Sequence, residues 1–228
     1  MSLALPSMPP AEFDFEQARF NMIEQQIRTW DVLDQDVLDL LFSVRREDYV
    51  PAQYRTLAFA DFEIPLGNAN GARMWTPKME ARVVQELTLR PDERVLEIGT
   101  GSGYLTALLA SCAGEVVSVE IDPPTAERAR RRLAPFPNVR VETGDGARGF
   151  GEEAYDAIVL TGSTPVLAER FLEQLRNNGR LFAVVGEAPA MKARLIHWNG
   201  PSARLSRDLF ETVIQPLVNA PQPARFVF

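Results

Sequence analysis

Three glycines at alternate positions are the clearest chemical signal in the sequence. Gly99, Gly101 and Gly103 follow the apolar run at residues 95–98 and precede a helix-like run that begins at Tyr104. Glycine at the point where a strand turns into a helix lets a ligand approach the backbone closely. A dinucleotide loop has the spacing G-x-G-x-x-G, which requires its third glycine where this chain has Tyr104. The spacing therefore favours a smaller nucleotide-like cofactor without a pyrophosphate.

Polar groups follow the next three predicted strands in the order that such a cofactor needs. Glu120 ends the second strand, where a carboxylate can accept hydrogen bonds from both hydroxyls of a ribose. Asp145 and Gly146 follow the third strand, and a carboxylate there can accept from an adenine amino group. Thr161 follows the fourth strand at the same edge. Each group alone also fits a turn or a helix cap, but their order predicts S-adenosylmethionine, which has the ribose and lacks the phosphates.

Predicted strands and helices alternate from residue 94 onward. Strands are predicted at residues 95–98, 116–120, 139–143, 157–160 and 181–185, with helices at 104–111, 125–133 and from Leu167 through Leu175 to Asn178-Gly179. Alternation of this kind predicts an α/β, doubly wound, mainly parallel, Rossmann-like sheet with helices on both faces. Residues 191–198 and 204–214 are predicted to complete seven strands as a closing antiparallel pair. Residues 215–228 are predicted to form an ordered, extended tail.

The residues before this core are predicted to position it and to cover it. Residues 1–76 are predicted as an N-terminal helical cap and substrate loop, and 77–228 as the cofactor-binding core, the two forming one compact unit. A helix is predicted over residues 11–28, with Phe20, Ile23 and Ile27 on one face. A second helix follows through residues 37–42, and residues 61–76 form a loop. Thr76 is then predicted to cap a helix that ends near Leu89.

Composition excludes several classes of protein. The chain has 228 residues and a net charge of −7, which favours one principal domain and opposes a broad nucleic-acid surface. The arginines at positions 128–132 are interpreted as a solvated helix face. Cys112 is the only cysteine and His197 the only histidine, so an intrachain disulfide and a Cys/His metal cluster are excluded, and no metal is predicted. Without a spanning apolar stretch or a signal-peptide pattern, the protein is expected in the cytoplasm and away from membranes.

Several segments match one enzyme family. They are Met22-Ile-Glu-Gln-Gln-Ile-Arg28, Arg45-Arg-Glu-Asp-Tyr-Val-Pro51, Ala60-Asp61, Val95-Leu-Glu-Ile-Gly-Thr-Gly-Ser-Gly-Tyr-Leu105, Gly144-Asp-Gly146, Gln174-Leu and Gly179-Arg-Leu. Over residues 22–186 the chain thereby resembles the protein-L-isoaspartate O-methyltransferases, within the class I S-adenosylmethionine-dependent methyltransferases. The glycine motif alone indicates only the larger class, whereas the Glu-Gln-Gln-Ile-Arg and Val-Pro segments are specific to the family.

The resemblance implies an activity and a set of binding residues. Members transfer the methyl group of S-adenosylmethionine to the α-carboxylate of isoaspartyl residues in damaged proteins or peptides, leaving S-adenosylhomocysteine. A carboxylate is already an anion, so the step needs in-line approach more than a general base. The predicted cofactor-binding residues are Glu97, Gly99, Thr100, Gly101, Gly103, Glu120, Ile121, Asp145, Gly146 and Thr161.

The substrate loop departs from the family pattern. The family has Ile-Ser-x-Pro with the serine near the reacting methyl group, and alignment on Pro77 places Trp75 at the serine position. Thr76 offers a nearby hydroxyl, although a helix cap is its simpler role, and Asp61 lies in a matched segment. Trp75, Thr76 and Asp61 are therefore candidate catalytic residues by position only.

Two alternatives remain open at this point. The altered loop also suits a methyltransferase that has kept the cofactor and changed to a small planar or apolar acceptor. The chain could equally bind S-adenosylmethionine or S-adenosylhomocysteine without catalysis, as an interaction protein. A dehydrogenase is a more distant alternative, and the sequence predicts no oligomeric state.

Overall fold

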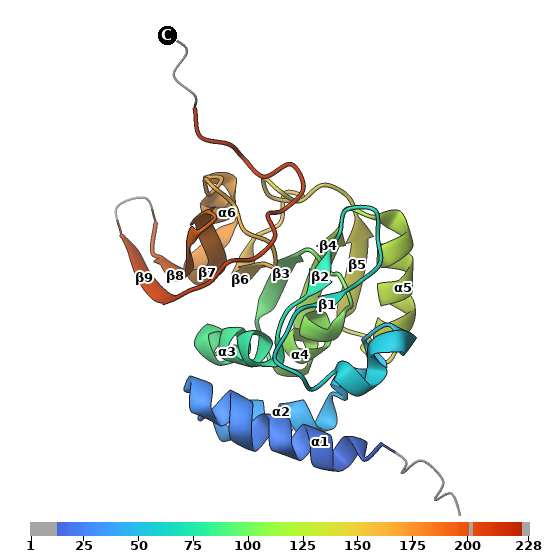
Figure 1. Ribbon diagram of the computed structural model, residues 1–228. Helices are drawn as coiled ribbons and strands as arrows, with labels where there is room; N and C mark the ends of the chain where they lie inside the picture. Colours follow the sequence, from blue (N-terminus) through green and yellow to red (C-terminus); the bar gives the residue numbers. More distant parts are fainter. Residues whose placement is uncertain (1–12, 201–202, 225–228) are drawn as a thin grey trace, which may run out of the picture.

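A seven-stranded sheet forms the centre of the protein (Figure 1). The computed structural model describes residues 13–200 and 203–224. The strand order is β5-β4-β3-β6-β7-β8-β9. The strands are β3 (Arg94–Ile98), β4 (Glu115–Glu120), β5 (Val139–Thr143), β6 (Tyr155–Leu160), β7 (Leu175–Glu187), β8 (Ala190–Trp198) and β9 (Arg204–Glu211). The strands from β5 to β7 are parallel, and β8 runs antiparallel to both β7 and β9, which confirms the predicted mainly parallel sheet and its closing antiparallel pair.

The order of the strands creates a binding position at the middle of the sheet. From β3 the chain proceeds to β4 and β5 on one side, and then returns to place β6 and β7 on the other side. The loops that leave β3 and β6 therefore diverge, and a crevice forms between them at the carboxyl ends of the strands. Gly99 follows β3 and Thr161 follows β6, so two of the predicted cofactor residues lie at this switch point.

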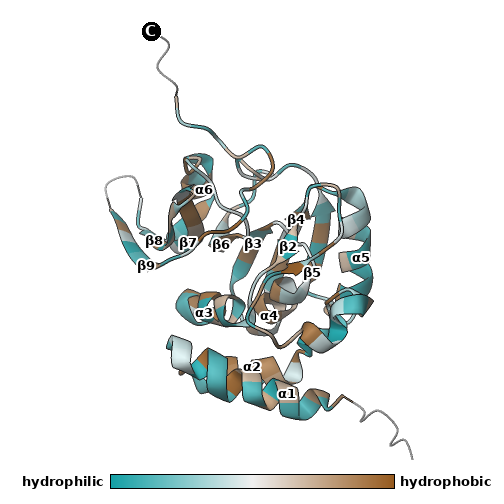
Figure 2. Cartoon of the chain, viewed as in Figure 1, coloured by the Kyte–Doolittle hydropathy of each residue, from teal (hydrophilic) through white to brown (hydrophobic). Residues whose placement is uncertain are grey.

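The sheet buries apolar side chains on both faces, as doubly wound parallel sheets do. On one face, Val95 and Val116 pack with α3 (Pro77–Leu87) and α4 (Tyr104–Cys112). On the other face, Leu96 packs with the short helix α6 (Arg170–Glu173) and nearby loops. The helix α5 (Pro123–Leu133) presents the arginine-rich segment outward, where Figure 2 shows mainly hydrophilic colour. The α/β, doubly wound fold class is confirmed.

The N-terminal segment forms a helical layer on the far side of α3 and α4 from the sheet (Figure 1). It contains α1 (Phe15–Met22), a π-helical turn (Ile23–Ile27), α2 (Gln35–Ser43) and the 3-10 helices η2 (Arg28–Trp30), η3 (Arg46–Asp48) and η4 (Ala52–Leu57). Its buried residues belong to the same hydrophobic cluster as α3 and α4. The boundary at residue 76 between the N-terminal cap with its substrate loop and the cofactor-binding core stays a prediction. No helix within residues 13–200 and 203–224 is both long and apolar enough to cross a bilayer.

The first helix differs from its prediction in the face it buries. Residues 11 and 12 lie outside the described residues, and α1 begins at Phe15. Phe20 is 50% exposed, whereas Ile23 and Ile27 are fully buried, so the prediction that all three share a face was wrong. Arg19 takes the buried position instead, because its guanidinium pairs with the buried carboxylate of Glu47. A buried ion pair of this kind is invisible to a count of apolar residues.

The helix before β7 is much shorter than predicted. It covers only Arg170–Glu173, and Leu175, expected within the helix, begins β7. The side chain of Gln174 ends the helix by bonding across to another loop: its amide donates to the carbonyl oxygen of Phe150 at 2.7 Å, and its oxygen accepts from the Phe150 N–H at 3.1 Å. The Gln174 carbonyl oxygen also accepts from the N–H of Tyr155, the first residue of β6, at 2.8 Å, so the chain joins the sheet earlier than helical periodicity suggests.

Candidate active site

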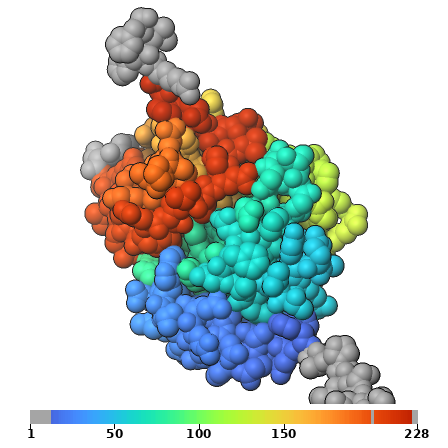
Figure 3. Space-filling view, viewed as in Figure 1, coloured from blue at the N-terminus to red at the C-terminus, as the bar shows by residue number. Residues whose placement is uncertain are grey.

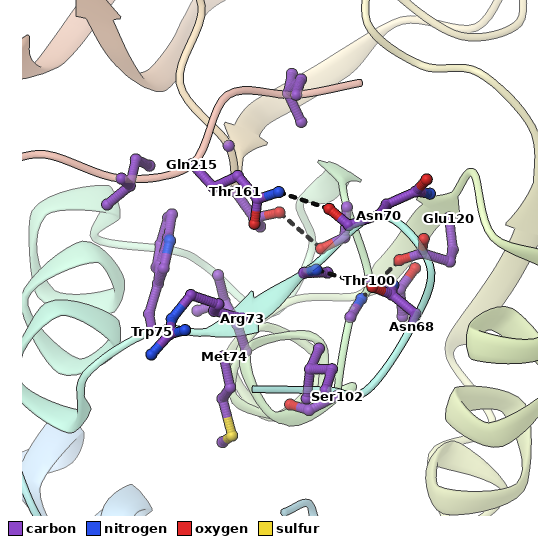
Figure 4. A pocket seen from close by; sticks show the side chains of 18 of the residues that line it. Asn68, Asn70, Arg73, Met74, Trp75, Thr100, Ser102, Glu120, Thr161 and Gln215 are labelled. Atoms are coloured by element: carbon purple, nitrogen blue, oxygen red, sulfur yellow. Dashed lines mark hydrogen bonds between the residues drawn. The ribbon is translucent and has the colours of Figure 1, made fainter. Parts of the chain in front are cut away.

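A cavity opens at the carboxyl ends of the central strands (Figure 4). The space between its walls is about 850 Å³, a figure that includes open solvent at the mouth. Its lining comes from the strand ends of the core, from α3 and α4, from the substrate loop at residues 63–75 and from the C-terminal segment at residues 214–218. The substrate loop is not wholly irregular as predicted, because it contains two short antiparallel strands, β1 (Ile64–Pro65) and β2 (Arg73–Met74). The predicted cofactor residues that line it are Glu97, Gly99, Thr100, Gly101, Glu120, Ile121 and Thr161.

Gly99 is required by close packing at the switch point. Its φ is +99°, and a Cβ atom there would lie 2.1 Å from the Oγ1 of Thr161. That hydroxyl donates to the carbonyl oxygens of Ile98 at 2.9 Å and Gly99 at 2.7 Å. The two strand ends can therefore meet only with glycine at position 99, which leaves the backbone open to a ligand.

Glu120 is held at the edge of the cavity by backbone groups. One carboxylate oxygen accepts from the N–H of Gly101 at 2.9 Å and the other from the N–H of Asp122 at 3.0 Å. These bonds fix the orientation of the side chain and leave further lone pairs on both oxygens. The arrangement suits the paired hydroxyls of a ribose.

Glu97 supplies a buried acceptor at the base of the cavity. One oxygen accepts from the hydroxyls of Thr106 at 2.5 Å and Ser118 at 2.6 Å, while Oε1 has no hydrogen-bond partner among the described residues. Burial raises the pKa of Glu97 to about 7, although these two hydrogen bonds oppose the rise, and the charge of Glu120 adds to it. An unpartnered oxygen on a fully buried carboxyl that lines the cavity offers a position for a hydrogen-bonding group of a ligand.

The remaining predicted cofactor residues do not line this cavity. Gly103 has a φ of +84°, and a Cβ atom there would approach the side chain of Leu133 to 3.2 Å, so its place is in the packing of α4 against α5. Asp145 and Gly146 line a smaller adjoining hollow that shares Glu120 with the main cavity. The carboxylate of Asp145 accepts from Asn219 at 2.8 Å. The adenine side of the predicted site is therefore bonded to the C-terminal segment.

The three candidate catalytic residues do not lie together in the structure. Trp75 lines the cavity, with its indole edge-on to the ring of Phe182 at a centroid distance of 6.1 Å. Thr76 and Asp61 are not among the lining residues. Thr76 is the N-cap residue of α3 and is followed by proline, as predicted, but its hydroxyl makes no capping hydrogen bond. Asp61 accepts instead from the ammonium group of Lys78 at 2.6 Å.

The C-terminal segment completes the cavity, which the sequence did not indicate. Its backbone pairs with the loop after β6, since Ser163 donates to the carbonyl of Gln215 at 3.0 Å and accepts from the N–H of Leu217 at 2.9 Å. The Gln215 amide donates to the carbonyl oxygen of Asn70 at 2.6 Å. Figure 3 shows the C-terminal segment, in red, beside the segment at residues 63–75, in cyan, on the surface. The one local signal was Gly162, where a Cβ atom would lie 2.8 Å from the Leu217 nitrogen.

Comparison with known proteins agrees with this geometry. The family model "Protein-L-isoaspartate(D-aspartate) O-methyltransferase" matches residues 17–220. The chain belongs to the protein-L-isoaspartate O-methyltransferase family. A relative named for this activity in Methanoculleus marisnigri is 42% identical over 171 residues, covering 74% of this chain and 77% of the relative. Another, from Methylorubrum populi, is 35% identical over 205 residues, covering 89% and 96%.

Solved structures of the family share the fold. A Plasmodium falciparum structure assigned to this family, in complex with S-adenosyl-L-homocysteine, superposes with a TM-score of 0.75 at 19% identity, covering 91% of this chain and 99% of that one. A second structure named protein-L-isoaspartate O-methyltransferase gives a TM-score of 0.74 at 23% identity, covering 87% and 65%. At these identities the likeness establishes the fold.

A buried ion pair connects the cap to the cavity wall in this family member. Arg46 of η3 and Glu80 of α3 form an ion pair in which both side chains are almost fully buried. The same guanidinium donates to the carbonyl oxygens of Ala58 at 2.8 Å and of Trp75, and it lies 5.0 Å from the ring centre of Tyr104. Arg46 therefore fixes the backbone at Trp75, one of the candidate catalytic residues.

Proposed function

We propose that the protein uses S-adenosylmethionine to methylate the α-carboxylate of isoaspartyl residues in damaged proteins or peptides. One observation carries the proposal. A single cavity joins the strand-end residues Gly99 and Glu120 to the loop that ends at Trp75. A cofactor held at the strand ends would thus share one enclosed space with an acceptor that enters along the loop.

The residues of the cavity fit the cofactor. Glu120 would accept from the ribose hydroxyls, Glu97 would face a cationic group, and Gly99 with Gly101 would let the ligand approach the backbone. S-adenosylmethionine, when bound, supplies a methyl group on a positively charged sulfur. Asp145 remains a candidate for the adenine amino group, because it lines the adjoining hollow.

The remaining wall suits a reaction that depends on positioning. Met74, Trp75 and Leu105 line the cavity and are at most 5% exposed. An acceptor carboxylate needs no base, so the protein must align it and exclude water. These apolar side chains would do both.

The direct test compares methyl transfer to an isoaspartyl peptide with transfer to its aspartyl twin. We expect transfer to the isoaspartyl peptide only. Stabilisation by S-adenosylhomocysteine is measured in parallel, because ligand at 100 times its dissociation constant adds about 2.7 kcal/mol to the free energy of unfolding. Stabilisation without transfer to either peptide would contradict the proposed acceptor and would leave cofactor binding intact.

A second candidate is a methyltransferase for a small planar or apolar acceptor. Its support is the indole of Trp75, which replaces the family serine and lines the cavity. The variant Trp75→Ser separates the two functions. A gain of isoaspartyl activity in the variant would show that the tryptophan alone redirects the site, and activity of the unaltered protein on the peptide removes the second candidate. A cytoplasmic location also remains a proposal, and it rests on the sequence.

A further inference from the structure

The cavity that would receive an anionic acceptor is itself acidic. Among the described residues that line it, Arg73 is the only cation. Four carboxylates line the same cavity, Glu63, Glu80, Glu97 and Glu120. These carboxylates would repel an anionic acceptor that enters the cavity unless a cation pairs with it, because like charges in a partly desolvated site interact strongly.

Most of these carboxylates are already engaged with other groups. Glu80 pairs with Arg46 behind the cavity wall. Glu97 and Glu120 accept hydrogen bonds from hydroxyl and backbone groups of the core. Arg73 is bound only by Glu63, through Nε at 3.1 Å from its carboxylate and Nη2 at 3.0 Å from its carbonyl oxygen. Its Nη1 has no hydrogen-bond partner among the described residues.

Arg73 also lies where an acceptor would enter. Its side chain is 44% exposed, whereas Trp75, two residues later, is 5% exposed. In an extended chain the side chains of residues i and i+2 share a face, and Figure 4 shows Arg73 and Trp75 on the same side of the loop. The guanidinium therefore stands at the mouth of the cavity, and the indole forms its inner wall.

We infer that Arg73 binds the carboxylate of the acceptor and makes the site selective for anionic acceptors. The inference rests on the proposed function and names the group that recognises the substrate. A guanidinium with a free N–H group can add a charge-assisted hydrogen bond to a carboxylate. The methyl ester product is neutral, so it loses this attraction and leaves more readily than the substrate.

The test measures binding and turnover in Arg73→Gln and Glu63→Gln. Binding of an isoaspartyl peptide to the protein saturated with S-adenosylhomocysteine is followed by calorimetry, and kcat and KM are measured with S-adenosylmethionine. Arg73→Gln should weaken peptide binding about tenfold. KM should rise more than kcat falls, since the attraction is strongest before the acceptor loses its charge. Glu63→Gln should strengthen peptide binding several-fold, because it frees Arg73 from its competing partner.

The matched control is Arg176→Gln. Arg176 has a similar exposure of 48% and pairs with Asp156 at 2.7 Å, and it is not among the residues that line the cavity. The variant Arg176→Gln should leave peptide binding unchanged. Unaltered peptide binding in Arg73→Gln, or weaker binding in Glu63→Gln, would overturn the inference. If Arg73→Gln weakened S-adenosylhomocysteine binding as much as it weakened peptide binding, the arginine would be assigned to the cofactor carboxylate instead. Failure of the unaltered protein to bind the peptide would refute the proposed function itself.

Discussion

The two halves of the cavity are built in different ways. In the part proposed to bind the cofactor, the cofactor half, Gly99, Glu120 and Thr161 each stand at the end of a strand of one sheet, so strand order brings them together. In the part proposed to receive the acceptor, the acceptor half, Asn70 and Gln215 meet although they are 145 residues apart in the sequence. Their contact depends on how two loops cross the surface. The cofactor half is thus fixed by regular secondary structure, and the acceptor half by long-range contacts, so the second should tolerate change in its loops more readily.

The largest expected effect comes from a buried ion pair in the acceptor half. Glu80→Gln leaves the Arg46 guanidinium without a counter-charge, and loss of one partner of a buried pair costs about 3–5 kcal/mol. Urea unfolding measures the loss. The control Glu127→Gln breaks an exposed pair with Arg131 and should cost less than about 1 kcal/mol. Similar losses in both variants would mean that the buried pair does not anchor the wall.

The cofactor half should be most sensitive at Gly99. Gly99→Ala places a Cβ atom 2.1 Å from Thr161 Oγ1 at a positive φ, so binding of S-adenosylhomocysteine should weaken roughly 100-fold, or about 3 kcal/mol. Calorimetry gives the affinity. Gly151→Ala is the control, since Gly151 also has a positive φ and a Cβ atom there meets nothing within 4 Å. Near-normal affinity in Gly99→Ala would show that the strand ends adjust more freely than their packing implies.

Glu97, in the cofactor half, should make the stability of the protein depend on pH. Its pKa of about 7 in the folded protein lies above the ordinary value of 4.5, so the folded state holds the proton more tightly. Protonation of Glu97 therefore contributes to the free energy of unfolding. The contribution is complete below pH 4.5 and is lost as the pH rises through 7. Relative to Glu97→Gln, the unaltered protein should therefore lose roughly 2–3 kcal/mol between pH 4 and pH 8. Urea unfolding of both proteins across this range tests the sign, and parallel stability curves would contradict it.

The smallest expected effect concerns the contact that closes the acceptor half. Gln215→Ala removes a hydrogen bond between exposed segments, which contributes about 1 kcal/mol or less. Release of S-adenosylhomocysteine, followed by stopped-flow fluorescence, should become a few-fold faster. Gln222→Ala is the control, because among the described residues the Gln222 side chain bonds only to the nearby Ala220. An equal effect of the two variants would remove any special role of the Gln215 contact.

Errors in the sequence predictions arise where side chains bond over long distances. Leu175 was predicted to be helical, but Gln174 bonds to Phe150 and turns the chain into β7. Phe20 was predicted to share a helix face with Ile23 and Ile27, but Arg19 takes the buried position and pairs with Glu47. In both cases a polar partner far away in the sequence outweighs local periodicity, since a buried polar group must be satisfied.

The sequence by itself determined the doubly wound sheet, and it predicted cofactor residues that the structure has at the ends of β3, β4 and β6. These follow from alternation of elements and from glycine and acidic residues at strand ends, which are local patterns. Only the tertiary structure decided that Asp61 lies apart from the cavity, that Arg73 stands at its mouth and that residues 214–218 form one wall. Such positions depend on contacts between distant segments, and no spacing along the chain encodes them.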